Sequence, residues 1–146
     1  MSLLAAVKKG DTRAIARAVE AGEASDDEVL SAALEQSDAV LAKLCRRVHT
    51  IDRFRTLVAA AEQRFKTLRL DNITTMVGDG TRGWPEAAPF DKIVVTAAAE
   101  ELPPVLLEQL GPGGILVAPV GPHDGIQKLK KIVRDGDALV ERVLAD

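Results

Sequence analysis

The sequence predicts an α/β fold, a truncated and mostly parallel sheet flanked by helices, preceded by an all-helical segment at residues 1–36. Three observations support this prediction. Helix-like and strand-like patterns alternate along residues 37–146, which is typical of a parallel sheet with crossover helices. The runs at 93–95 and 115–117 are apolar without alternation, as in strands covered on both faces. Residues 1–36 contain no β-branched run and no alternating segment. We therefore divide the chain into a helical segment, 1–36, and an α/β domain, 37–146.

The first 36 residues are predicted to form three short helices. Apolar residues recur there at helical spacing, and two breaks containing glycine separate the three groups. Asp11 follows the first break and Ser25 closes the second, and both residue types are favoured where a helix begins.

The first half of the α/β domain is expected to contain two helices and two strands. A helix is predicted over 38–44 and a strand over 48–52. A longer helix covers 55–67, because its apolar residues follow the period of a helix lying on a sheet. The second strand takes 73–77.

The second half begins with a strand at 92–96 and a helix at 103–110. Gly-Pro-Gly-Gly at 111–114 predicts a helix stop and a turn, followed by a strand at 115–120. In the tail, Asp-Gly lies between two apolar runs, which predicts a hairpin around 134–137. Residues 139–144 could instead form a short helix.

Composition argues against several classes of partner. The 146 residues carry 19 Lys and Arg and 22 Asp and Glu, a net charge of −3, and the basic residues are spread along the chain. This balance disfavours nucleic acid and anionic membranes as partners. No apolar run approaches the roughly 20 residues of a membrane span, so we expect a cytoplasmic protein. Cys45, His49 and His123 do not form a set of metal ligands, so no metal site is predicted.

The stretch 77–98 is the most informative part of the chain. A Gly-Asp-Gly turn follows one predicted strand, and Thr-Ala-Ala follows the next. Parallel strands place their carboxyl ends at one edge of a sheet, where α/β proteins bind ligands. The sequence thus predicts a ligand crevice at this edge.

At this point the residues show a family resemblance. The chain resembles protein-L-isoaspartate O-methyltransferases, enzymes with the Rossmann-like fold of S-adenosylmethionine-dependent methyltransferases. The similarity covers about residues 39–140. It is carried by an ordered set of short motifs: RVHTIDR at 47–53, DNI at 71–73, VGDG at 77–80, GWP at 83–85, PFD at 89–91, VTAA at 95–98, GGIL at 113–116 and PVG at 119–121.

The resemblance implies a cofactor, S-adenosyl-L-methionine, and residues that would bind it. Asp52 resembles the acid that binds the ribose diol, a role that suits a carboxylate at a strand end. Asp79 resembles the residue that accepts a hydrogen bond from the adenine amino group, with Gly78 and Gly80 shaping the turn around it.

The same resemblance implies a substrate edge at Thr96, Ala97 and Ala98. In the family this edge lies beside the methyl donor and the incoming isoaspartyl carboxylate, and small side chains there leave room for a peptide. An isoaspartyl peptide would be the substrate if the chain is active.

Each of these residues also has a purely structural interpretation. Asp52 and Asp79 could simply cap the turns that follow them. Trp84 is typical of a loop anchor over a core edge. His49 alternates within a predicted strand, which is typical of a structural or exposed residue rather than of a base.

The chain lacks two features that such a methyltransferase needs. No strand enters a G-x-G-x-G turn, where backbone approaches the methionine part of the donor. Residues 1–36 hold no counterpart of the segment with the catalytic hydroxyl, so no catalytic residue is predicted. In this fold the missing first strand lies between the strands at 48–52 and 92–96.

Loss of that strand would leave two unpaired edges inside the sheet. We expect the strands at 48–52 and 92–96 to pair directly, which gives the order 73–77, 48–52, 92–96, 115–120. A second copy pairing at an open edge is the alternative, which would make a homo-oligomer.

Three functions follow. The favoured one is a remnant or recombined, chimeric or truncated, methyltransferase domain without methyl-transfer activity. The second is an active isoaspartyl carboxyl methyltransferase with a reorganised site. The third is a protein-interaction module, because residues 1–22 are similar to the helix pair of an ankyrin repeat, although solenoids need about three repeats.

Overall fold

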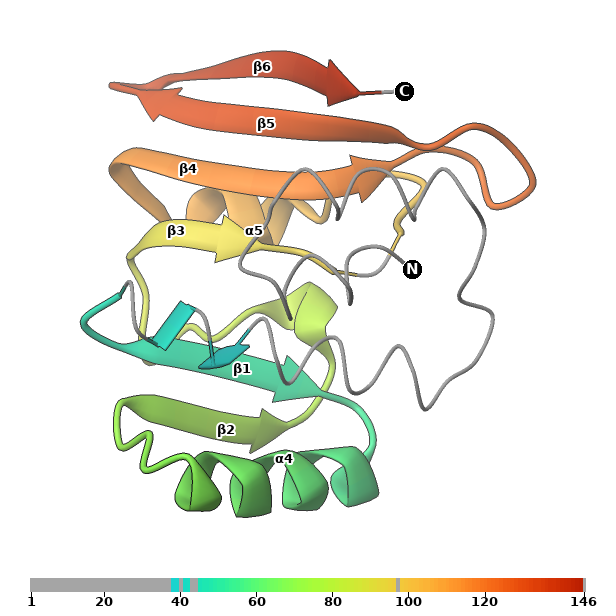
Figure 1. Cartoon of the computed structure of the whole chain (residues 1–146). Coiled ribbons are helices and arrows are strands. Elements are labelled where there is room, and N and C mark those ends of the chain that lie inside the picture. Colours follow the sequence, from blue (N-terminus) through green and yellow to red (C-terminus); the bar gives the residue numbers. More distant parts are fainter. Residues whose placement is uncertain (1–37, 40, 43–44, 97, 146) are drawn as a thin grey trace. The chain divides into compact units, whose positions relative to one another are not determined.

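The computed structural model describes residues 38–39, 41–42, 45–96 and 98–145. The helices predicted over 1–36, and with them the proposed interaction module, lie outside the described residues. The chain divides into two compact units between Gly78 and Asp79. Each unit is described by itself below (Figure 1).

The first unit contains two parallel strands and a helix (Figure 1). Strand β1 (Val48–Asp52), helix α4 (Arg55–Thr67) and strand β2 (Ile73–Val77) have the bounds that the sequence predicts. The two strands pair in parallel. Helix α4 buries Val58, Ala61 and Phe65, the face expected from its apolar period.

Asn72 joins the helical residues before β1 to the start of β2. Its Nδ2 donates hydrogen bonds to the carbonyl oxygens of Ala42, at 2.7 Å, and Cys45, at 3.1 Å. Its own carbonyl accepts from the backbone N–H of Val48 at 2.9 Å. The described part of the predicted 38–44 helix, residues 38–39 and 41–42, is helical.

The second unit is built on a four-stranded sheet with the order β3-β4-β5-β6. Strand β3 pairs in parallel with β4, and β4, β5 and β6 are successively antiparallel. The elements of this unit are η1 (Gly80–Arg82), β3 (Phe90–Val94), α5 (Pro104–Glu108), β4 (Leu110–Val120), β5 (Lys128–Asp135) and β6 (Ala138–Ala145).

The predicted tail hairpin is confirmed by β5 and β6. The two strands pair from Asp135 opposite Ala138 to Leu129 opposite Ala145, with a turn between them. The alternative helix over 139–144 is wrong, because the backbone of β6 is engaged along its length in pairing with a neighbouring strand.

Strands β3 and β4 both begin earlier than predicted. Phe90 lies opposite Leu110, but Lys92 lies opposite Ile115, so β4 carries extra residues at this point. The extra residues are the Gly-Pro-Gly-Gly segment, in which Gly113 has a φ of 71°. The predicted break is therefore a local irregularity inside β4, because Leu110, which precedes the break, also pairs with β3.

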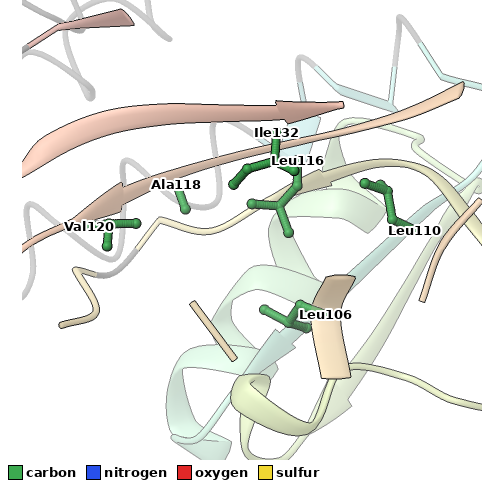
Figure 2. Close-up of a cluster of buried hydrophobic side chains, with 6 residues drawn as sticks. All are labelled: Leu106, Leu110, Leu116, Ala118, Val120 and Ile132. Atoms are coloured by element: carbon green, nitrogen blue, oxygen red, sulfur yellow. The ribbon is translucent and has the colours of Figure 1, made fainter. Parts of the chain in front are cut away.

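The core of the second unit lies between α5 and one face of the sheet. Leu116, Ala118 and Val120 alternate along β4 and are buried, as expected for one face of a strand. Figure 2 shows them with Leu106 and Ile132. Arg134 of β5 fastens α5 to this face, because its Nη2 donates to the carbonyl of the helix residue Leu107.

The expected direct pairing of the strands at 48–52 and 92–96 would join the two units and stays a prediction. The described strands form two hydrogen-bonded sheets, and within its sheet β3 pairs with β4 alone. Val94, expected on a central strand, is 53% exposed. The β1–β2 and β3–β4 pairs are each joined by a crossover that contains a helix, α4 and α5 respectively. Association of copies through open edges stays a prediction.

In the described part of the chain, no helix is both long enough and apolar enough to span a bilayer.

Candidate functional site

The carboxyl ends of β1 and β2 bring Asp52 and Gly78 together. The backbone N–H of Gly78 donates to the Asp52 carbonyl at 2.9 Å. Oδ1 of Asp52 accepts from the Phe54 N–H, also at 2.9 Å. The Asp52 side chain thus closes a local turn through one oxygen, as its structural interpretation predicts. Phe54 is 57% exposed beside it.

A second carboxylate, Asp38, lies close to Asp52. Burial raises the pKa of Asp38 to about 6, a hydrogen bond with the Thr50 side chain opposes that shift, and the charge of Asp52 adds to it. Asp38 stands in no motif of the sequence. Because Asp38 and Thr50 meet only when the chain folds onto β1, no local pattern could have identified the pair.

Asp38 makes stability depend on pH. The pKa of this carboxyl is about 6 in the folded protein against the usual 3.8, so the folded state binds more protons between these values and stability falls as pH rises from about 4 to 6. We expect Asp38→Asn to raise the free energy of unfolding by about 2 kcal/mol at pH 7 and to have little effect at pH 4. Urea denaturation at the two pH values measures this. Equal effects at both would contradict it, and Asp71→Asn is a control.

The turn after β2 is held by Asp79. Its Oδ1 accepts from the backbone N–H of Thr81 at 3.0 Å and from the Thr81 hydroxyl at 2.7 Å. Asp79 is the N-cap of η1. The capping interpretation of Asp79 is therefore confirmed.

The two glycines of this turn leave space that the fold does not require. Neither Gly78 nor Gly80 has a positive φ. A Cβ on Gly78 would approach Met76 no closer than 3.9 Å, and one on Gly80 would have no heavy atom within 4 Å. An alanine would fit at both positions, so the absence of side chains there clears room beside the Gly-Asp-Gly backbone.

The loop after η1 is fastened by a buried glutamine. Gln109, 8% exposed, accepts from the Trp84 N–H at 2.9 Å and donates to the Arg82 carbonyl at 3.1 Å. Gly83 lies between these two residues with a φ of 60°. No local pattern predicts the role of Gln109, because its partners lie 25 and 27 residues earlier in the chain.

The predicted substrate edge follows β3 in the second unit. Thr96 and Ala98 are both exposed, and Ala97 lies outside the described residues. The chain stays along β4 here: the Val95 N–H donates to Val117, and Ala99 bridges to Val120. The small exposed residues therefore lie at the carboxyl end of the parallel β3–β4 pair.

No metal centre is present among the residues whose placement is described. Burial and the nearby charge of Arg47 lower the pKa of His49. His49 belongs to β1, as predicted.

Comparison with known proteins identifies relatives of this fold. A family model described as protein-L-isoaspartate (D-aspartate) O-methyltransferase matches residues 34–145. The protein-L-isoaspartate O-methyltransferase of Paramagnetospirillum magneticum is 58% identical over 97 residues, which are 66% of this chain and 45% of that protein. The chain spans about half the length of the relatives it matches.

Solved structures give the same result. One named protein-L-isoaspartate O-methyltransferase has a TM-score of 0.63 and 26% identity, covering 68% of this chain and 32% of its own. Another, from Plasmodium falciparum, is provisionally named as such an enzyme and is in complex with S-adenosyl-L-homocysteine. It has a TM-score of 0.59 and 24% identity, covering 81% of this chain and 57% of its own. The α/β fold is therefore that of these methyltransferases, and the chain belongs to the protein-L-isoaspartate (D-aspartate) O-methyltransferase family.

Proposed function

We propose that this chain is a remnant or recombined S-adenosylmethionine-dependent methyltransferase domain that has no methyl-transfer activity on its own. One observation carries the proposal. The family match begins at residue 34 and includes Asp52 and the Gly-Asp-Gly turn, but the chain has no G-x-G-x-G segment ahead of them. The residues that would bind the adenosine side of the donor are therefore present, whereas this sequence holds no segment of the kind that binds its methionine side.

The residues present fit the adenosine side of such a donor. Oδ1 of Asp52 accepts a hydrogen bond from the Phe54 N–H, so Oδ2 is the oxygen that would accept from a ribose diol. Gly78 and Gly80 have no side chain, which leaves space next to the backbone of the turn that the methyl group of an alanine would reduce. When bound, the donor would supply an activated methyl group, and these residues would position its nucleoside end.

The missing segment decides the expected affinity. A donor cradle contributes several backbone hydrogen bonds, each worth about 0.5 to 1.5 kcal/mol net. Their loss weakens binding by about two to four powers of ten, so a micromolar site becomes a millimolar one. The small residues Thr96 and Ala98 could border a peptide, but positioning that peptide against a weakly held donor would be inefficient.

An active isoaspartyl methyltransferase is the second candidate. The identity of 58% to a protein named as such an enzyme favours it. Its chemistry would be attack of an isoaspartyl carboxylate on the donor methyl, which depends on positioning more than on acid–base groups.

Calorimetric titration with S-adenosylmethionine tests the proposal. We expect no binding with a Kd below about 100 μM, and no methyl transfer to an isoaspartyl peptide. Binding below that concentration, lost in Asp79→Ala and kept in the control Asp91→Ala, would show an intact donor site and overturn the proposal. Detected methyl transfer would establish the second candidate. Circular dichroism of each variant confirms that it is folded.

A further inference from the structure

The second unit contains a pocket whose lining includes no residue of the Gly-Asp-Gly turn. It has a volume of about 290 Å³ and lies between α5 and the strands β4, β5 and β6. At about 30 Å³ for each water molecule, it has room for a group the size of one long side chain. It opens to solvent on one side.

The floor of the pocket is apolar. Val120 and Ile132, which are 8% and 3% exposed, belong to the core cluster drawn in Figure 2. Leu107 of α5, Leu102 and Leu139 complete it. A floor continuous with the core favours an aliphatic group over a polar one, because the backbone of these strands is already engaged in the sheet.

The rim of the pocket is acidic. Glu100 and Glu101 come from the segment before α5, and Glu141 comes from β6. Lys130 is the cation of the rim, and its Nζ lies 2.7 Å from Oε1 of Glu141. Glu100 and Glu101 have no cationic partner in the part of the chain that the structure describes, so the rim keeps two uncompensated carboxylates.

Strand alternation explains why apolar floor residues and charged rim residues line the same pocket. Lys130 and Ile132 are two residues apart on β5 and point to the same face, and Glu141 lies opposite Ile132 on β6. The Lys130–Glu141 pair thus closes one side of the rim, while the glutamates before α5 border the other side.

We propose that this pocket binds a free protonated aliphatic amine. The alkyl chain lies on the apolar floor, and the ammonium group takes the position beside Glu100 and Glu101. Charge complementarity selects this class of ligand: a carboxylate with the same alkyl chain would meet two like charges, and a neutral alcohol would leave both glutamates without a counter-charge.

Nuclear magnetic resonance titration of the ¹⁵N-labelled chain with n-hexylammonium tests the proposal. We expect saturable shifts confined to α5, the end of β4, β5, β6 and the segment before α5. n-Hexanoate should bind at least about tenfold more weakly, and n-hexanol should fall between the two. Equal affinity for hexylammonium and hexanoate, shifts elsewhere, or no saturation by about 50 mM would each overturn it.

A pair of variants tests the role of the rim. We expect the double variant Glu100→Gln, Glu101→Gln to weaken hexylammonium binding at least about fivefold while leaving hexanol binding unchanged. Glu108→Gln, in α5 but outside the pocket lining, is the matched control and should keep the parent affinity. Unchanged binding in the double variant would overturn the proposal. The result is independent of whether S-adenosylmethionine binds.

Discussion

Replacing Leu116 with alanine will lower the free energy of unfolding by about 3 to 5 kcal/mol. Leu116 is 0% exposed, lies on β4 at the centre of the second sheet, and packs in the cluster under α5 (Figure 2). Loss of its side chain removes buried apolar contact and leaves a cavity. Neighbouring strands cannot close that cavity without breaking their hydrogen-bonded register.

Urea denaturation followed by Trp84 fluorescence measures this effect, because Trp84 is the single tryptophan of the chain and lies in the second unit. Leu144→Ala is the matched control. Leu144 is 48% exposed on β6, so its truncation should cost less than about 1 kcal/mol. Equal losses in the two variants would mean that the second unit is not built around Leu116.

Replacing Gly83 with alanine will destabilise the second unit by about 3 kcal/mol. Gly83 has φ 60° and ψ −148°, a backbone conformation that residues other than glycine rarely adopt. A Cβ there would clash with the side-chain amide of Gln109. Gln109 could move away only by breaking its hydrogen bonds to Trp84 and Arg82, since it is itself buried.

Two other glycines separate backbone strain from this clash. Gly136 has a φ of 60° with no heavy atom within 4 Å of its Cβ position, so Gly136→Ala introduces strain alone. Gly80 has neither strain nor a near neighbour. Denaturation of the three alanine variants should show losses in the order Gly80, Gly136, Gly83. A loss at Gly83 no larger than at Gly136 would show that the contact with Gln109 contributes nothing.

The candidate site could be predicted in part. Asp52 and Gly78 meet at the ends of two parallel strands, as the strand pattern predicted, because parallel pairing brings carboxyl ends to one edge. The capping of Thr81 by Asp79 also follows from local chemistry. Asp38 beside Thr50 and Gln109 beside Trp84 could not be predicted, since each pair joins residues that are distant in the chain.

The sequence by itself determined the short-range organisation of this protein. The bounds of β1, α4 and β2 follow from apolar period and turn residues, and the hairpin of β5 and β6 follows from its Asp-Gly turn. The tertiary structure alone decided which residues that are far apart in the chain meet. The turn of a hairpin imposes the geometry of its own two strands, whereas the contact of Gln109 with Trp84 closes a loop of 25 residues. That is a property of the whole chain, which no local pattern encodes.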